Sequence, residues 1–397
     1  MSEFKTIDDL DVAEKRILVR VDLNVPMVNG RVINTTRIDR IVPTLSELSK
    51  KGGKVIIISH FGRPEGQVVP GMSLSPVARA LSKSCGLHIE FATDTIGNSA
   101  KEKINGMKSG EIIMLENLRF DSGEEANDEA FASKLSQFGD AFVSDAFSCS
   151  HRAHASTVGL AQLLPSASGR LMQAELESLS NILQNPTLPI AAIVGGAKVS
   201  TKMEVLGNLS KKVDLLIIGG GMANTFFLAQ GYDVGRSFCE RDMVECAYNI
   251  LVEAKRNGCE VILPIDCVVA KKLEKGAKSQ TVGPGLIPYD SMVLDIGNAS
   301  IANIAAKLKQ CKTLVWNGPL GAFEVQPFDR GTNVIADVVV RLTKERKIIS
   351  VAGGGDTVAA LAHASADDSF SYISTAGGAF LDWLEGKKLP GVEVLRK

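Results

Sequence analysis

The 397-residue sequence is poor in aromatic side chains and carries almost no net charge. Phe, Trp and Tyr make up 5% of the residues, and the formal net charge at pH 7 is -1. Nucleic-acid-binding proteins usually interleave basic and aromatic residues, and proteins that bind anionic membranes carry a basic excess. We therefore expect no nucleic-acid partner and no membrane partner, so any anion site must be a local cluster of basic residues.

Cysteines and long apolar runs are also scarce. The seven cysteines include no C-x-x-C pair and lie mostly in apolar runs, a pattern typical of buried, reduced thiols. No apolar run approaches the roughly 20 residues that span a bilayer. The first residues, MSEFKTIDDLDVAEKR, are too acidic for a signal or transit peptide. These features predict a cytoplasmic protein.

Several well-known catalytic signatures are absent. The sequence has no G-x-G-x-x-G fingerprint, no P-loop, no H-R-D or D-F-G of protein kinases, no H-E-x-x-H and no G-x-S-x-G. The missing dinucleotide fingerprint argues against a dehydrogenase.

What the sequence does have is a regular alternation of short apolar runs with helix-like stretches. The runs are rich in Val and Ile and apolar on both faces, as strands are in parallel sheets covered by helices. They lie at 17–21, 55–58, 112–115, 141–143, 190–194, 215–218, 261–263, 313–316, 348–351 and 372–374. We therefore predict an α/β fold built on mostly parallel sheets covered by helices.

Nearly every run ends directly at glycine or at a polar side chain, and these ends form two chemical sets. In the first half of the chain they offer arginine, histidine, carboxylate and amide groups, whereas in the second half they are mostly glycine. Ligands of such sheets bind beyond the carboxyl ends of the strands. The change falls around 166–189, where a helical candidate at Ser168–Leu183 would join two lobes, in keeping with the roughly two domains expected at this length.

The first set is basic. Six side chains lie at or near predicted strand ends: Arg37, His60, Arg63, Arg119, His151 and Arg152. Several guanidinium groups on one sheet edge suit a multiply anionic ligand, because Arg forms bidentate bonds to phosphate and carboxylate. Asp22 and Asn24 would fix hydroxyl groups of the same small phosphorylated metabolite. Taken singly, each arginine is more often a solvated surface residue, and a lone His60 or His151 is as often structural.

The second set suits a nucleotide. Glycine clusters at 195–196, 219–221 and 353–355 follow strands, and such loops let backbone N–H groups approach phosphates at a helix N-terminus. Each cluster alone is more often just a tight turn. Asp356 beside the third cluster would meet a magnesium ion, and Glu324 would accept hydrogen bonds from ribose hydroxyls.

The stretch VGGAKVSTK at 194–202 places two lysines four residues apart after a strand. We expect the strand to turn into a helix, so that Lys198 and Lys202 lie one turn apart on one helical face. Both ammonium groups would then reach the phosphate chain of a nucleotide.

Together the two sets predict phosphoryl transfer between two ligands, in lobes that close to exclude water. A non-catalytic phosphometabolite-binding protein is the alternative, although it has no use for the glycine loops or for Asp356.

Eight motifs in the sequence resemble those of a known protein family. They are RVDLNVP at 20–26, SHFGRP at 59–64, LENLRF at 115–120, SHRAHAST at 150–157, GGAKVSTK at 195–202, IIGGGMANTF at 217–226, WNGPLGAFE at 316–324 and GGGDT at 353–357. In these motifs and in their order, the chain resembles the phosphoglycerate kinases over its whole length. The resemblance implies two Rossmann-like lobes facing across a cleft. It also implies reversible, in-line transfer of a phosphoryl group from 1,3-bisphosphoglycerate to ADP after domain closure, giving 3-phosphoglycerate and ATP. In this reaction the acceptor is an ADP phosphate oxygen in one direction and a carboxylate in the other, and neither carries a proton at neutral pH. No general base is then needed, and Arg37 and Lys202 are expected to contribute charge instead.

The resemblance also implies domains and an oligomeric state. It gives a phosphoglycerate-binding lobe at 1–170, an interdomain helix at 171–187 and a nucleotide-binding lobe at 188–384. The tail, about 385–397, would pack back on the first lobe, and the protein would be a monomer.

Site residues follow from the same motifs. Carried over by motif, phosphoglycerate would bind at Asp22, Asn24, Arg37, His60, Phe61, Gly62, Arg63, Arg119, His151 and Arg152. ADP or ATP would bind at Gly196, Lys198, Lys202, Gly219, Gly220, Asn317, Glu324, Gly353, Gly354, Gly355, Asp356 and Thr357. Asp356 would hold Mg²⁺ as part of the nucleotide complex, and the catalytic residues would be Arg37, Lys198 and Lys202.

Four residues depart from the family pattern. Arg170 stands where an apolar residue is expected, and Leu320 and Ala322 replace Met and Val. We interpret these three as packing variation. Ala376 replaces the first glycine of a phosphate loop, although its backbone amide stays available.

Overall fold

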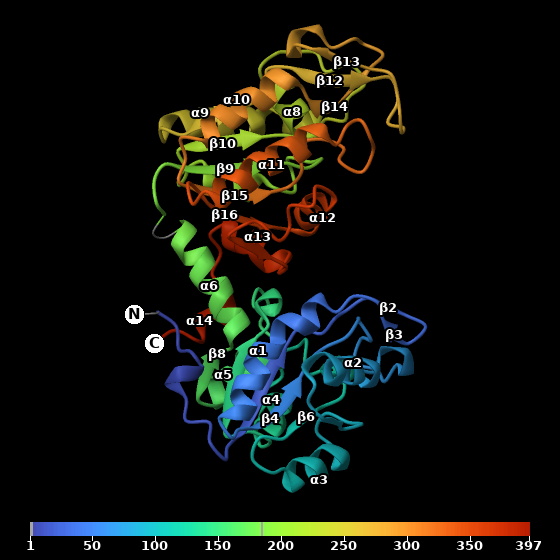
Figure 1. Cartoon of the computed structure of the whole chain (residues 1–397), viewed down its shortest axis with the longest axis vertical. Coiled ribbons are helices and arrows are strands. Elements are labelled where there is room, and N and C mark those ends of the chain that lie inside the picture. Colours follow the sequence, from blue (N-terminus) through green and yellow to red (C-terminus); the bar gives the residue numbers. More distant parts are fainter. Residues whose placement is uncertain (1–2, 184–185) are drawn as a thin grey trace. The chain divides into compact units, whose positions relative to one another are not determined.

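The computed structural model describes residues 3–183 and 186–397 and divides the chain into two compact units (Figure 1). Unit 1 runs up to Glu177 and also includes Lys388–Lys397, whereas unit 2 is Ser178–Lys387. No helix of the described residues is both long enough and apolar enough to cross a membrane.

Unit 1 is built on a six-stranded sheet in which every pairing is parallel, in the order β5-β6-β4-β1-β7-β8. The strands are β1 (Arg16–Val21), β4 (Lys54–Ile58), β5 (Ile89–Phe91), β6 (Ile112–Met114), β7 (Ala141–Asp145) and β8 (Ser166–Ser168). A small antiparallel hairpin, β2 (Met27–Val28) with β3 (Arg31–Val32), stands apart from the sheet.

Helices cover both faces of this sheet. Alternate strand residues point to opposite faces, so Ile17 and Val19 of β1 pack in one core with α1 (Thr36–Lys50) and α2 (Ser75–Cys85). Leu18, between them, packs in a second core with α3 (Asn98–Gly106), α4 (Glu129–Ser136) and α5 (Leu160–Leu163). The strands are therefore buried on both faces, which explains their continuous apolar sequence.

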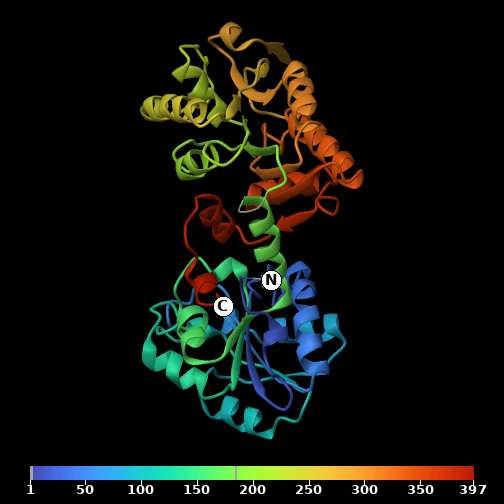
Figure 2. The same cartoon turned by 90° about the vertical axis from the view of Figure 1, so that its left-hand side faces the viewer.

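Unit 2 repeats the plan with a second parallel six-stranded sheet, in the order β11-β10-β9-β15-β16-β17. Its strands are β9 (Ile190–Val194), β10 (Leu215–Ile218), β11 (Glu260–Ile262), β15 (Thr313–Asn317), β16 (Ile349–Gly353) and β17 (Tyr372–Ser374). Its helices are α7 (Met203–Leu209), α8 (Met222–Ala229), α9 (Val244–Arg256), α10 (Asn298–Leu308), α11 (Arg330–Lys344), α12 (Gly355–His363) and α13 (Gly378–Leu384). Figure 2 shows α9, in yellow, and α10 and α11, in orange, on opposite sides of the sheet.

Unit 2 also carries a small antiparallel sheet in the order β13-β12-β14, made of β12 (Cys267–Ala270), β13 (Ser279–Val282) and β14 (Met292–Ile296). The prediction of two parallel sheets covered by helices is confirmed, and all ten apolar runs are strands. The sequence analysis missed the three-residue strands β5 and β8. It also missed the antiparallel sheet, in which β13 (SQTV) is mostly exposed and has no apolar pattern.

The long helix α6 (Arg170–Leu183) contains the boundary between the two units. The predicted start at Ser168 is wrong, because Ser168 pairs with Ser144 as the last residue of β8. The buried carboxylate of Asp145, at the end of β7, then accepts the N–H of Met172 at 2.9 Å in the first turn. Part of the predicted interdomain helix, at 184–185, lies outside the described residues.

Arg170 is the first residue of α6, and its guanidinium forms ion pairs rather than packing in an apolar site. Its Nη2 lies 2.7 Å from Asp8 Oδ1 and 2.7 Å from Glu47 Oε1. The interpretation of Arg170 as packing variation is therefore wrong: the side chain joins the helix start to the N-terminal segment and to α1 by charge.

The chain end belongs to unit 1. The N–H of Lys5 donates to the Leu395 carbonyl at 3.0 Å, and the N–H of Ser168 donates to the Lys5 carbonyl at 2.9 Å. A short helix, α14 (Pro390–Glu393), precedes this contact. The last residues thus extend the hydrogen bonding at the β8 edge of the sheet.

Candidate functional site

In unit 1, the end of β1 brings Asp22 against Arg37. Asp22 Oδ2 accepts hydrogen bonds from Arg37 Nη1 at 2.6 Å and from Ser148 Oγ at 2.5 Å, and Oδ1 accepts the N–H of Asn24 at 3.0 Å. Arg37 lies in the first turn of α1, not at a strand end as its sequence context suggested. The pair therefore forms where the β1 end meets the start of the helix.

The segment after β4 is held to the same edge. Asn24 Oδ1 accepts the N–H of Gly62 at 3.1 Å, and Arg119 Nη1 donates to the Gly62 carbonyl at 2.7 Å. Asn117 fixes Phe61 in both directions, because its Oδ1 accepts the Phe61 N–H and its Nδ2 donates to the Phe61 carbonyl. These bonds bring the predicted residues of the β1, β4 and β6 ends together.

The other predicted arginines of unit 1 are exposed. Within the described part of the chain, no hydrogen bond or ion pair is found for the side chains of Arg63 or Arg152. His151 is half-buried beside Arg152. The guanidinium groups of Arg63 and Arg152 therefore have N–H donors available for a ligand, whereas Arg119 Nη2 already lies 3.0 Å from the Glu125 carboxylate.

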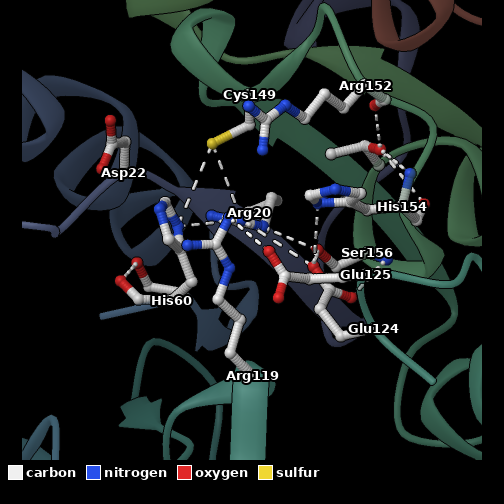
Figure 3. A network of polar contacts seen from close by, with 12 residues as sticks. Arg20, Asp22, His60, Arg119, Glu124, Glu125, Cys149, Arg152, His154 and Ser156 are labelled. Carbon is white, nitrogen blue, oxygen red and sulfur yellow. Dashed lines mark hydrogen bonds and ion pairs between the residues drawn. The ribbon is translucent and has the colours of Figure 1, made fainter. Parts of the chain in front are cut away.

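Beneath these residues lies a buried polar network that the sequence analysis missed (Figure 3). Arg20, on β1, is 1% exposed. Its Nε donates to Ser156 Oγ at 2.7 Å, and its Nη2 lies 3.1 Å from His60 Nδ1. Ser156 Oγ in turn donates to Glu124 Oε1 at 2.5 Å. The available signal was a charged residue inside a strand that is otherwise apolar, because such a charge must find partners when it is buried.

Burial and charge set the protonation of this site. Burial lowers the pKa of His60 well below its usual value, and the cations Arg20, Arg119 and Arg37 act in the same direction, so the imidazole is neutral. Burial works to raise the pKa of Asp22, but the charge of Arg37 and hydrogen bonds from Ser148 and the Asn24 N–H outweigh it and keep that pKa below its usual value. The site thus contains an ionised carboxylate, a neutral histidine and several arginines.

In unit 2, the prediction that Lys198 and Lys202 share a helical face is wrong. Residues 195–202 form a loop, closed by a bond from the Lys202 N–H to the Val199 carbonyl, and α7 begins only at Met203. Glu240 keeps this segment in a loop, since its carboxylate accepts hydrogen bonds from the Ser200 N–H at 3.0 Å and from Ser200 Oγ at 2.5 Å. The two lysines consequently lie in different environments.

Lys202 turns back toward the strand ends, and Lys198 is exposed. Lys202 Nζ donates to the carbonyls of Gly195 at 2.6 Å and Asn317 at 3.0 Å, at the carboxyl ends of β9 and β15. Burial lowers the pKa of Lys202 to about 8, and Asp356 partly opposes this. A partly buried ammonium with a lowered pKa is stabilised in its charged form when an anion binds beside it.

The loops after β15 and β16 are tied together. Thr357 Oγ1 accepts the Gly318 N–H and donates to the Gly353 carbonyl, both at 2.7 Å, and Asn317 Nδ2 donates to the same carbonyl at 2.7 Å. Gly354 has φ +98°, and a Cβ there would meet Asn317 Nδ2 at 2.6 Å. Only glycine fits this approach of the two loops.

Beside these loops lies a cavity of about 350 Å³. Its wall is mostly apolar, with Phe227, Met292 and Leu294, while Glu324 and Asp356 provide carboxylates. Gly196 and Gly220 also line it, and φ +70° at Gly220 keeps that loop close to the Gly196 backbone. A volume of this size, apolar with a few polar groups, suits a small organic ligand such as a purine base.

Two of the residues that depart from the family pattern, Leu320 and Ala322, lie in the wall of this cavity. Leu320 is buried, and a Cβ on Gly219 would meet its Cδ2, so the two positions pack directly on each other. Ala322 lines the cavity as well. Ala376 lies elsewhere in unit 2, just before α13. Its N–H donates to Ser374 Oγ at 3.2 Å, so the expectation that this amide stays available is wrong.

Asp356 is the one carboxylate that was predicted to hold a metal ion. The described residues include no group of three or more His, Cys, Asp or Glu side chains that could hold one. A single exposed carboxylate fits Mg²⁺, which often takes one or two carboxylates and completes its octahedron with phosphate oxygens and water.

A family model described as phosphoglycerate kinase matches residues 7–387. This chain belongs to the phosphoglycerate kinase family. Phosphoglycerate kinases of Methylorubrum extorquens (strain PA1) and Rhizobium meliloti (strain 1021) are 54% and 56% identical to it. The first match covers 100% of this chain and 99% of the relative, and the second covers 99% of each.

Solved phosphoglycerate kinase structures share the fold. The enzyme of Coxiella burnetii matches with a TM-score of 0.92 and 41% identity over 99% of each chain. That of Pyrococcus horikoshii OT3 matches with a TM-score of 0.80 and 31% identity over 98% of each chain. The chain is therefore a phosphoglycerate kinase enzyme, an ATP-binding transferase of glycolysis.

Proposed function

We propose that the basic site of unit 1 binds the phosphoglycerate. The observation that supports this most directly is the combination of the Asp22–Arg37 pair with exposed guanidinium groups, on Arg63 and Arg152, that have no partner among the described residues. Arginine forks match phosphate and carboxylate oxygens, and the Asp22 carboxylate can accept a hydrogen bond from a hydroxyl group. Asn24, His60, Arg119 and the backbone around Gly62 complete the site.

The nucleotide would bind in unit 2. We place the base in the apolar cavity and the ribose at Glu324, where an exposed carboxylate can accept two hydroxyl hydrogen bonds. The phosphates would lie on the glycine loops at 196, 219–220 and 353–355 and at the start of α12, where free N–H groups and the helix dipole favour anions. Asp356 would hold Mg²⁺ of the nucleotide complex together with phosphate oxygens and water.

The transfer we propose needs no general base. A β-phosphate oxygen of ADP attacks the phosphorus of the acyl phosphate in line, and the bond from phosphorus to the carboxyl oxygen breaks as a carboxylate leaves. No proton moves in this step, so the protein contributes positive charge and position. Arg37 would neutralise charge from unit 1 and Lys202 from unit 2, with Lys198 on the phosphate chain, after the lobes close around both ligands.

The substrate assignment is tested with arginines of unit 1. Arg63→Met and Arg152→Met should each raise the KM for 3-phosphoglycerate about 10-fold, the cost of a charged hydrogen bond, and leave the KM for ATP unchanged. Arg79→Met is the matched control, because Arg79 is an exposed arginine of α2 whose side chain, among the described residues, bonds only to Ser75. Wild-type KM for 3-phosphoglycerate in both test variants would refute the site.

Sedimentation of the purified protein tests the proposed monomer. A single species near the chain mass of 42.3 kDa is expected, and a stable dimer at assay concentrations would contradict it.

A further inference from the structure

The buried arginine beneath the basic site constrains the histidine above it. Arg20 Nη2 lies 3.1 Å from His60 Nδ1, and Nη1 donates to the Val21 carbonyl at 2.5 Å (Figure 3). A guanidinium has five N–H donors and no acceptor. A hydrogen bond between the two groups therefore requires that Nδ1 of His60 carry no proton.

The proton of the neutral ring must then sit on Nε2. That atom has no hydrogen-bond partner in the part of the chain that the structure describes. His60 stands at the end of β4, beside Asp22 and Arg119, where the substrate is proposed to bind. The Nε2–H group is thus left as a donor without a protein acceptor.

We propose that Arg20 is a positioning residue that holds His60 in its Nε2–H tautomer, so that the imidazole offers a neutral, fixed donor to an anionic oxygen of the phosphoglycerate. This role rests on the proposed substrate site of unit 1. Arg20 would act through His60 and would not touch the substrate.

Arg20 is itself held in place by the network below it. Ser156 Oγ accepts from Arg20 Nε and donates to Glu124, whose Oε1 lies 3.9 Å from Arg20 Nη2. Glu124 is completely buried and also accepts the Ser156 N–H at 3.0 Å. The guanidinium plane is therefore fixed at one end by Ser156 and presents its other end to the histidine.

The groups that face His60 keep the ring neutral. Arg20, Arg119 and Arg37 all disfavour a positive charge on it, and burial does so more strongly, whereas Asp22 alone favours it. The Cys149 thiol lies 4.0 Å from Nδ1, and burial raises its pKa, so it remains uncharged. A neutral donor keeps the same hydrogen-bonding capacity across the physiological pH range, which an ordinary histidine does not.

The direct test measures the protonation of the two ring nitrogens by NMR. In protein labelled with ¹⁵N-histidine, two-bond ¹H–¹⁵N correlation spectra distinguish protonated from unprotonated ring nitrogens, and loss of one set of signals in His60→Gln assigns His60 among the five histidines. We expect Nε2 protonated and Nδ1 unprotonated, without change from about pH 5.5 to about pH 8. An Nδ1–H tautomer, or titration of His60 within that range, would overturn the proposal. This result does not depend on turnover, so it stands or falls separately from the proposed substrate site.

Kinetics test the consequence for binding. Arg20→Met should raise the KM for 3-phosphoglycerate about 10-fold at pH 8, because the donor is no longer fixed. The ratio of variant to wild-type KM should fall at lower pH, as the released His60 begins to gain a proton. Ser156→Ala should produce a smaller rise of the same kind. Arg16→Met is the control, since Arg16 lies at the other end of β1 and pairs with Asp140 at the surface. An unchanged KM in Arg20→Met, or a KM ratio that is independent of pH, would refute the positioning role.

Discussion

The ion pairs of Arg170 give a prediction that can be worked out from the structure. Arg170 binds both Asp8 and Glu47, and its hydrogen bonds are the main reason that the pKa of each carboxyl falls to about 2. Replacing Arg170 with Leu removes both pairs. The buried first turn of α6 around Asp145 stays intact, so the loss of stability should come from the two missing ion pairs alone.

The magnitude follows from the exposure of the three groups. The fall of the Glu47 pKa from 4.5 to about 2 corresponds to about 3 kcal/mol, an upper value that Arg170 shares with Lys51. Asp8 is 62% exposed, so solvent screening removes most of its contribution. We expect Arg170→Leu to lower the free energy of unfolding of unit 1 by about 1–2 kcal/mol at pH 7.

The pH dependence has a definite sign. Both carboxyls have lower pKa values in the folded state than in the unfolded state, so their stabilisation is complete above about pH 5 and is lost as the pH falls toward 2. The difference in unfolding free energy between wild type and Arg170→Leu should therefore shrink as the pH is lowered through this range.

Urea unfolding, followed by two signals, measures the effect. Both tryptophans, Trp316 and Trp383, lie in unit 2, so fluorescence reports that unit, whereas far-ultraviolet circular dichroism reports both. The loss should be larger by circular dichroism. Lys103→Leu, which removes one exposed pair with Glu90, is the control and should cost less than about 0.5 kcal/mol. A loss in Arg170→Leu that is equal at pH 3 and pH 7 would refute the reasoning.

Three further predictions concern the nucleotide site. Thr357→Val leaves the buried Gly318 N–H without its acceptor, so unit 2 should lose about 1–3 kcal/mol in tryptophan-monitored unfolding; an unchanged midpoint would contradict this. Glu324→Ala should raise the KM for ADP about 10-fold but leave that for 2′,3′-dideoxy-ADP unchanged, and equal effects on both nucleotides would exclude ribose binding. Chelation of magnesium should abolish turnover, and Asp356→Asn should raise the magnesium concentration needed for half-maximal rate; an unchanged requirement would remove Asp356 from the metal site.

Much of the fold was predictable because strands buried on both faces leave continuous apolar runs. Several proposed site residues were predicted from the same signal, since Asp22, His60 and Asn317 come directly at or after such runs. Short strands could not be found in this way. Strand β13 of the antiparallel sheet could not be found either, because it is exposed and lacks an apolar pattern.

What the sequence could not supply is the direction of individual side chains. Spacing placed Lys198 and Lys202 on one helical face, but the contact of Ser200 with Glu240, 40 residues away, keeps that segment in a loop. Arg20 looked like part of a strand, and only its position between β4 and β7 shows that it must bond to His60 and Ser156. Such contacts join distant residues, so no local pattern encodes them.

We propose that cationic side chains stabilise the negative charge of the phosphoryl group during transfer, with Lys202 as the main cation of unit 2. The most direct measurement compares kcat and the calorimetric Kd for ADP in Lys202→Met with those in Lys198→Met, the exposed lysine of the same loop. Lys202→Met should lower kcat about 100–1000-fold and change Kd less than about 5-fold, the pattern of a contact made in the transition state. Lys198→Met should have the smaller effect on kcat. A loss in Lys202→Met that appears entirely in Kd, with kcat near that of the wild type, would contradict the account.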